Sequence, residues 1–201
     1  MNLGINKSNI EKQKKMYLVF ISIIVITIIL GFFFYFIVSD SNKRLVINLQ
    51  KEFFSNIGNI NYLSSFINSF ISNFLYLFII FILGLSVVGF VFIIGIIIFK
   101  SFILGFSVSS IIGSFGIKGI LLSFLYIFPH QIIYLIILLL MSFFGIRFCY
   151  RLFKYIFLKS SINFRMLKDK YIKVFLFCIL GSFLCSLYEV FIMTYLLKVL
   201  V

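Results

Sequence analysis

The sequence contains no alanine and no tryptophan, one proline, one histidine and only five acidic residues. Charged residues make up 11% of the 201 positions, whereas hydrophobic residues make up 63%. About a quarter of the residues of a soluble domain are charged. Together with a mean hydropathy of +1.23, these values indicate an integral membrane protein with one membrane domain, residues 1–201, and no sizeable soluble domain.

The few residues able to perform chemistry are not arranged in a known catalytic or metal-binding pattern. Cys149, Cys178 and Cys185 have no Cys-x-x-Cys spacing and no neighbouring histidine, whereas a metal site needs three or four ligands. The phosphate-loop, His-Glu-x-x-His and Gly-x-Ser-x-Gly motifs are absent. We therefore expect no metal, no cofactor, no catalytic residue and no enzymatic activity.

Long apolar runs predict an all-α helical bundle of about five transmembrane helices. The expected spans are 17–38, 74–99, 101–117, 119–145 and 174–197. The third run is at the short limit for a crossing, so a full crossing and a re-entrant hairpin both remain open. Between the first two spans, residues 39–73 form an extracytoplasmic segment. This segment is either an amphipathic helix lying on the outer surface or a docking surface for an extracytoplasmic partner.

Basic residues predict the orientation. Lysines at positions 7, 12, 14 and 15 lie in an N-terminal tail, residues 1–16, and a second basic cluster fills the loop 146–173. Basic segments stay in the cytoplasm, so we expect a multi-pass protein of the cell membrane with a cytoplasmic N-terminus and an extracytoplasmic C-terminus. The net charge of +13 lies at membrane edges, which favours anionic lipid headgroups as partners and argues against nucleic acid.

Small residues mark one helix face and one turn. Ser101, Gly105, Ser109 and Gly113 recur every fourth position and therefore share a face that another helix can approach closely. That face either packs inside the bundle or binds a partner, including another copy in an oligomer. A turn is expected at Gly116, Lys118 and Gly119.

Three residues are candidates for an intramembrane polar site. Pro129 lacks an amide donor and is expected to kink its helix. His130 beside it is an ionisable group in hydrocarbon, which either relays protons or binds a substrate, or else satisfies a carbonyl that the kink frees. Glu189 lies on the small-residue face of the last run, with His130, Lys118 or Lys198 as candidate partners.

The order of short motifs resembles the stage II sporulation protein M family. The motifs are Gly84-Leu-Ser-Val-Val-Gly89, Phe99-Lys-Ser-Phe-Ile-Leu-Gly-Phe106, Gly116-Ile-Lys-Gly119 and Phe128-Pro-His-Gln131. The resemblance covers nearly the whole chain, and its most specific part is the run of about 35 residues that ends at Pro-His. Many members of the wider family carry a glutamate in a Pro-His-x-x-x-Glu pattern, where this chain has Tyr134.

The resemblance implies a non-enzymatic membrane scaffold. Such proteins recruit peptidoglycan hydrolases of the stage II sporulation protein D and P type to the septal membrane during engulfment, or serve envelope remodelling in lineages that do not sporulate. The segment 39–73, the turn 116–119 and the spans would then offer docking faces. The residues themselves leave open a membrane component of a transporter or exporter, perhaps paired with an ATPase, in which His130 and Glu189 line a polar cavity.

Overall fold

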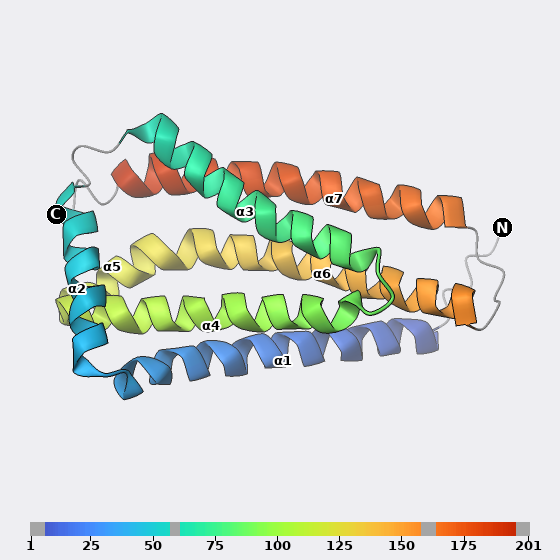
Figure 1. Cartoon of the computed structure of the whole chain (residues 1–201), viewed down its shortest axis with the longest axis horizontal. Helices are drawn as coiled ribbons and strands as arrows, with labels where there is room; N and C mark the ends of the chain where they lie inside the picture. The colour runs from blue at the N-terminus through green and yellow to red at the C-terminus, as the bar shows by residue number, and fades with distance from the viewer. Residues whose placement is uncertain (1–6, 57–60, 158–163, 196–201) are drawn as a thin grey trace.

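The computed structural model describes residues 7–56, 61–157 and 164–195, and this part of the chain is helical, without strands (Figure 1). Its elements are α1 (Lys7–Ile37), α2 (Asp40–Ser55), α3 (Tyr62–Gly84), α4 (Gly89–Phe115), α5 (Ile117–Leu122), the π-helix η2 (Ser123–Ile127), α6 (Phe128–Phe157), α7 (Phe164–Leu187) and the π-helix η3 (Tyr188–Met193). Five candidate spans are long and apolar enough to cross a membrane: Tyr17–Ile37, Tyr62–Gly84, Gly89–Phe115, Pro129–Phe157 and Arg165–Met193. The predicted all-α membrane bundle with about five spans is confirmed.

The five long helices run side by side along the long axis of the molecule, and α2 lies across one end of them (Figure 1). This end, which we call the α2 end, also holds α5 and η3. The opposite end, which we call the far end, holds the start of α1, the turn between α3 and α4 and the start of α7. The orientation of these ends across the membrane stays a prediction, with the α2 end extracytoplasmic.

The break between the second and third spans lies at residues 85–88 and not at Lys100, so the expected boundaries 74–99 and 101–117 are wrong. Helix α3 ends before this turn, and α4 then continues for 27 residues, with Lys100 in its interior. That length is sufficient for a full crossing, and α4 is not a short re-entrant segment.

The sequence predicts a membrane edge at Lys100 because a charge normally ends an apolar run. In the structure its ammonium lies 3.8 Å from the centroid of the Tyr76 ring and 5.5 Å from that of Tyr134. Aromatic faces attract a cation, and the attraction increases where water is excluded. Two tyrosines on neighbouring helices thus accommodate the charge within the span.

Other expected boundaries also shift, because the helices extend beyond their apolar cores. The segment 39–73 divides into α2 and the first half of α3, and Ile57 of the expected surface helix lies outside the described residues. The basic loop 146–173 is largely helical, as the last turns of α6 and the first turns of α7. Lysine and arginine side chains are tolerated there because they can reach the headgroup region from a helix end.

The small-residue face of α4 packs against α1. A Cβ atom at Gly105 would collide with the backbone carbonyl oxygen of Ile28, and one at Gly113 would collide with the ring of Tyr35. Ser101 and Ser109 on the same face are buried. The structure thus uses this face inside the bundle, where its small side chains let two backbones meet.

The turn after α4 depends on Gly116, the one described residue with a left-handed backbone conformation, at φ 60°. Glycine adopts this conformation without steric cost. Across the expected turn, the Gly119 N–H donates to the Gly116 carbonyl oxygen at 2.9 Å, and α5 begins within it, at Ile117. A Cβ atom at Gly119 would collide with the carbonyl oxygen of Ile111, whereas Lys118 is exposed. The helix is then π-helical over η2, directly before Phe128 and Pro129, which fits the missing proline donor.

We predict that Gly105→Val destabilises the protein by about 1–3 kcal/mol, because the added side chain overpacks the contact between α1 and α4. Gly95→Val is the matched control in the same helix, since nothing lies within 4 Å of a Cβ atom there. Thermal unfolding in detergent measures both. Equal loss of stability in the two variants would contradict the packing role of Gly105.

A polar cavity inside the bundle as candidate functional site

One face of α3 is polar although the helix has the length and hydropathy of a membrane span. Ser65, Asn68, Ser69, Ser72 and Asn73 follow one another at the i, i+3, i+4, i+7 and i+8 spacing that places residues on one helix face. They line a cavity of about 400 Å³ together with Phe53, Lys100, Gln131, Glu189, Val190 and Thr194. We call this space the polar cavity.

Glu189 and His130, two of the residues selected from the sequence, meet at this cavity. The Nε2 atom of His130 lies 3.7 Å from Oε1 of Glu189, and Ser69 donates a hydrogen bond of 2.5 Å from Oγ to Oε2. The His130 side chain is 5% exposed and that of Glu189 is 23% exposed. The carboxylate is therefore held from two sides while part of it still borders the open space.

The other candidate partners of Glu189 do not reach it. Within the described ranges, the ion pairs shorter than 4 Å are His130–Glu189 and Lys43–Asp40, so Lys118 is not a partner. Lys198 lies outside the described residues. The pairing of His130 with Glu189 is the geometry that an intramembrane polar site requires, because ionisable groups in a membrane are costly unless they have partners.

Hydrogen bonds connect the helices around the cavity. Asn73 donates from Nδ2 to Ser186 Oγ at 3.1 Å, and Tyr134 donates from its hydroxyl to the backbone carbonyl of Asn73 at 2.7 Å. Cys185 Sγ donates to the carbonyl of His130 at 3.2 Å. Tyr134, which occupies the position of the family glutamate, thus joins α6 to α3, and Cys185 joins α7 to α6.

A second, more apolar space adjoins the polar cavity under α2, and we call it the apolar groove. It has a volume of about 360 Å³ and is lined by Val46, Leu49, Gln50, Phe53, Phe54, Ile103, Leu104, Ser107, Ile111, Ile127, His130, Gln131 and Glu189. Phe53, Gln131 and Glu189 line both spaces. One side of the combined site is therefore polar and the other is hydrocarbon-like.

Gln50 holds α2 over the end of α4. Its Nε2 donates to Ser110 Oγ at 2.6 Å, and its Oε1 accepts from Ser114 Oγ at 2.6 Å. Phe54 is buried, with its ring centroid 5.1 Å from that of Phe115. The helix is thereby fixed in place as the cover of the apolar groove.

Apolar side chains close the bundle toward the far end. Six of them, none more than 3% exposed, pack in one core cluster: Leu77, Ile80, Ile93, Ile97, Leu138 and Met141. The polar cavity lies in the half of the bundle next to α2, because its lining comes from α2, the first half of α3 and η3. Among the described residues, the cavity lining therefore stays in the α2 half, and the buried layer beyond it is apolar.

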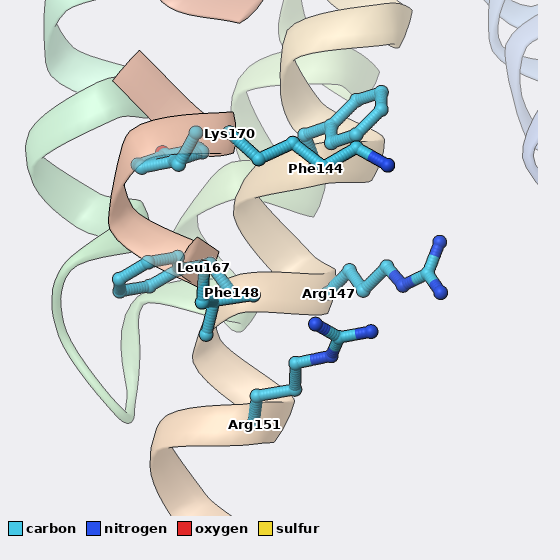
Figure 2. A pocket seen from close by; sticks show the side chains of 7 residues that line it. Phe144, Arg147, Phe148, Arg151, Leu167 and Lys170 are labelled. Carbon is cyan, nitrogen blue, oxygen red and sulfur yellow. The ribbon is translucent and has the colours of Figure 1, made fainter. Parts of the chain in front are cut away.

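A separate basic pocket of about 50 Å³ lies between α6 and α7 near the far end. Figure 2 shows Arg147 and Arg151 projecting to the same side of α6, with Lys170 reaching toward Phe144 from α7. The Lys170 ammonium lies 5.8 Å from the centroid of the Phe144 ring. This pocket belongs to the basic edge that the sequence predicts to face anionic headgroups.

Sequence reasoning missed Lys100 and the polar face of α3 as site residues. The spacing of the serines and asparagines indicates one polar helix face. The sequence places these residues in the extracytoplasmic segment 39–73, and so it does not predict that the face lines a cavity. Within the described residues, no group of three or more histidine, cysteine or acidic side chains could hold a metal ion. The arrangement is suited to binding a polar or charged group within the membrane.

We predict that cysteines introduced by Ser65→Cys and Ser72→Cys react with a membrane-impermeant maleimide added to intact cells. Both positions line the polar cavity, whereas the native cysteines are buried. Ile80→Cys and Ile97→Cys are the matched controls in the apolar layer and should stay unlabelled. Labelling of all four variants would mean that water reaches the far half. Labelling of the serine positions only after permeabilisation would reverse the predicted orientation.

Comparison with known proteins identifies a family for this chain. The searches of the curated proteins and of the solved structures gave no significant match. The family model described as Stage II sporulation protein M matches residues 19–193, a region that begins in α1 and ends with η3. Since this region covers most of the chain, the protein belongs to the stage II sporulation protein M family.

Proposed function

We propose that this protein is a non-enzymatic membrane scaffold that recruits peptidoglycan hydrolases of the stage II sporulation protein D and P type to the septal membrane, during engulfment or envelope remodelling. Membership of the family supports this role, and the family is not a known enzyme family. The hydrolases perform the chemistry, and this chain holds them at the membrane surface.

The outer face of α2 is the observation that carries the proposal. Arg44, Asn48, Lys51 and Glu52 are exposed on that face, on a helix that Gln50 and Phe54 fix to the bundle. A rigid surface loses little conformational entropy when a partner binds. Charges of both signs on it favour one partner orientation over others.

We predict that reversing two of these charges, with Arg44→Glu and Lys51→Glu, weakens hydrolase binding about tenfold, which corresponds to about 1.4 kcal/mol. The measurement is affinity purification from native cells in mild detergent after brief crosslinking, with the partners quantified by mass spectrometry. Lys168→Glu is the matched control, because this residue is exposed near the far end. It should leave hydrolase recovery unchanged.

Two results would contradict the scaffold. Crosslinked complexes from the wild-type protein that contain no peptidoglycan hydrolase would remove its main premise. Equal hydrolase recovery from the wild type and from the double variant would contradict the outer face of α2 as the docking surface, because the hydrolases would then bind elsewhere on the protein.

The second candidate function is a membrane component of a transporter or exporter. It is favoured by the position of His130 and Glu189, which border the apolar groove, with Glu189 also lining the polar cavity. Recovery of an ATPase or a substrate-binding subunit in the same purification would favour this candidate. Glu189→Gln would then abolish transport while the protein still folds.

A further inference from the structure

Two opposite charges border the polar cavity without forming an ion pair with each other. Lys100 and Glu189 both line it, yet among the described residues no carboxylate lies within 4 Å of the Lys100 ammonium. Charges inside a membrane are costly unless they are compensated. Lys100 is faced by tyrosine rings, and Glu189 is held by His130 and Ser69. A ligand carrying one anionic and one cationic group would add a fully charged partner to each of the two.

The lining of the polar cavity favours a primary ammonium over a quaternary one as the cationic group of such a ligand. Glu189 and the oxygens of Asn68, Ser72 and Gln131 offer hydrogen-bond acceptors, which an ammonium can use through its three donors. A trimethylated ammonium donates no hydrogen bond and is recognised by aromatic faces. Among the described residues that line the polar cavity, Phe53 alone is aromatic, and a single ring does not form the aromatic cage that such an ammonium requires.

The apolar groove specifies the remainder of the ligand. It adjoins the polar cavity at Phe53, Gln131 and Glu189 and is lined mainly by aliphatic and aromatic side chains. Leu45 and Leu49 are exposed on the flank of α2 next to the groove. A hydrocarbon chain can therefore lie in the groove while a polar head occupies the cavity, which has the volume of an ordinary small-molecule site.

We propose that the polar cavity and the apolar groove together bind a lipid whose headgroup carries a phosphate and a primary ammonium, as in phosphatidylethanolamine. The phosphate lies against Lys100, the ammonium lies against Glu189, and one acyl chain follows the groove under α2. A purely anionic headgroup would offer Glu189 no cationic group and would be repelled by its carboxylate. This site goes beyond the scaffold function and does not depend on it.

The proposal can be tested by native mass spectrometry of the full chain, released from detergent after incubation with phosphatidylethanolamine, phosphatidylcholine or phosphatidylglycerol. We expect phosphatidylethanolamine to be retained about tenfold more than either of the others. Lys100→Met and Glu189→Gln should each remove this preference. Lys118→Met and Asp169→Asn are the matched controls at exposed positions and should keep it.

Further arms separate binding from folding and the head from the chain. Ser72→Leu places an apolar side chain at the cavity wall without changing any charge, and it should also reduce retention. Thermal unfolding should show stabilisation by phosphatidylethanolamine for the wild type and not for these variants. Free phosphoethanolamine should stabilise the wild type less than the lipid does.

Three outcomes would overturn the proposal. Equal retention of the three lipids by the wild type would remove the headgroup selectivity. Unchanged selectivity in folded Lys100→Met and Glu189→Gln proteins would place the lipid elsewhere, such as at the basic pocket near the far end. Equal stabilisation by free phosphoethanolamine would show that the groove contributes nothing.

Discussion

A lysine ammonium in the middle of a membrane helix requires compensation from within the protein, and the site depends on this constraint. Lys100 obtains it from the rings of Tyr76 and Tyr134, which lie on α3 and α6. The polar cavity to which Lys100 contributes is lined on one side by the serines and asparagines of α3. Polar side chains of this face also have partners of their own, Glu189 for Ser69 and Ser186 for Asn73, and polar groups in hydrocarbon are retained where they have partners.

The packing of α1 on α4 determines where that charge points. Ser101 is buried and Gly105 meets the backbone of α1 at Ile28. Consecutive residues on an α-helix are turned by about 100° from each other, so Lys100 is directed away from α1 and toward α3. Because the chain contains no alanine, glycine and serine provide the close contacts of the helices. The small-residue face and the polar cavity are thus two consequences of one helix orientation.

The class of fold could be predicted from the sequence because hydropathy and length alone decide it, and the pairing of His130 with Glu189 was among the alternatives that helical spacing offered. The break between the second and third spans could not be predicted from the sequence. A lysine in an apolar run looks the same in the sequence whether it lies at a membrane edge or inside a span. Only the tertiary contacts of Lys100 with Tyr76 and Tyr134 show that it lies inside the span. The sequence places the polar half of α3 in the extracytoplasmic segment 39–73 for a related reason, because the partners of its polar side chains lie on distant helices.

The proposed scaffold surface and the proposed lipid site are both at the α2 end, and they share a helix. Phe53 lines the polar cavity and the apolar groove, while Lys51 and Glu52, immediately before it in the sequence, are exposed on the outer face. Phe53 is next to Phe54 and within one turn of Gln50, which fix α2 to the bundle, so a ligand that contacts Phe53 acts beside the contacts that hold this helix. If a partner that prefers one position of α2 changes the affinity of the cavity for its ligand, then by thermodynamic reciprocity the ligand changes the affinity for that partner by the same factor. The apolar layer of the far half confines this coupling to the α2 end.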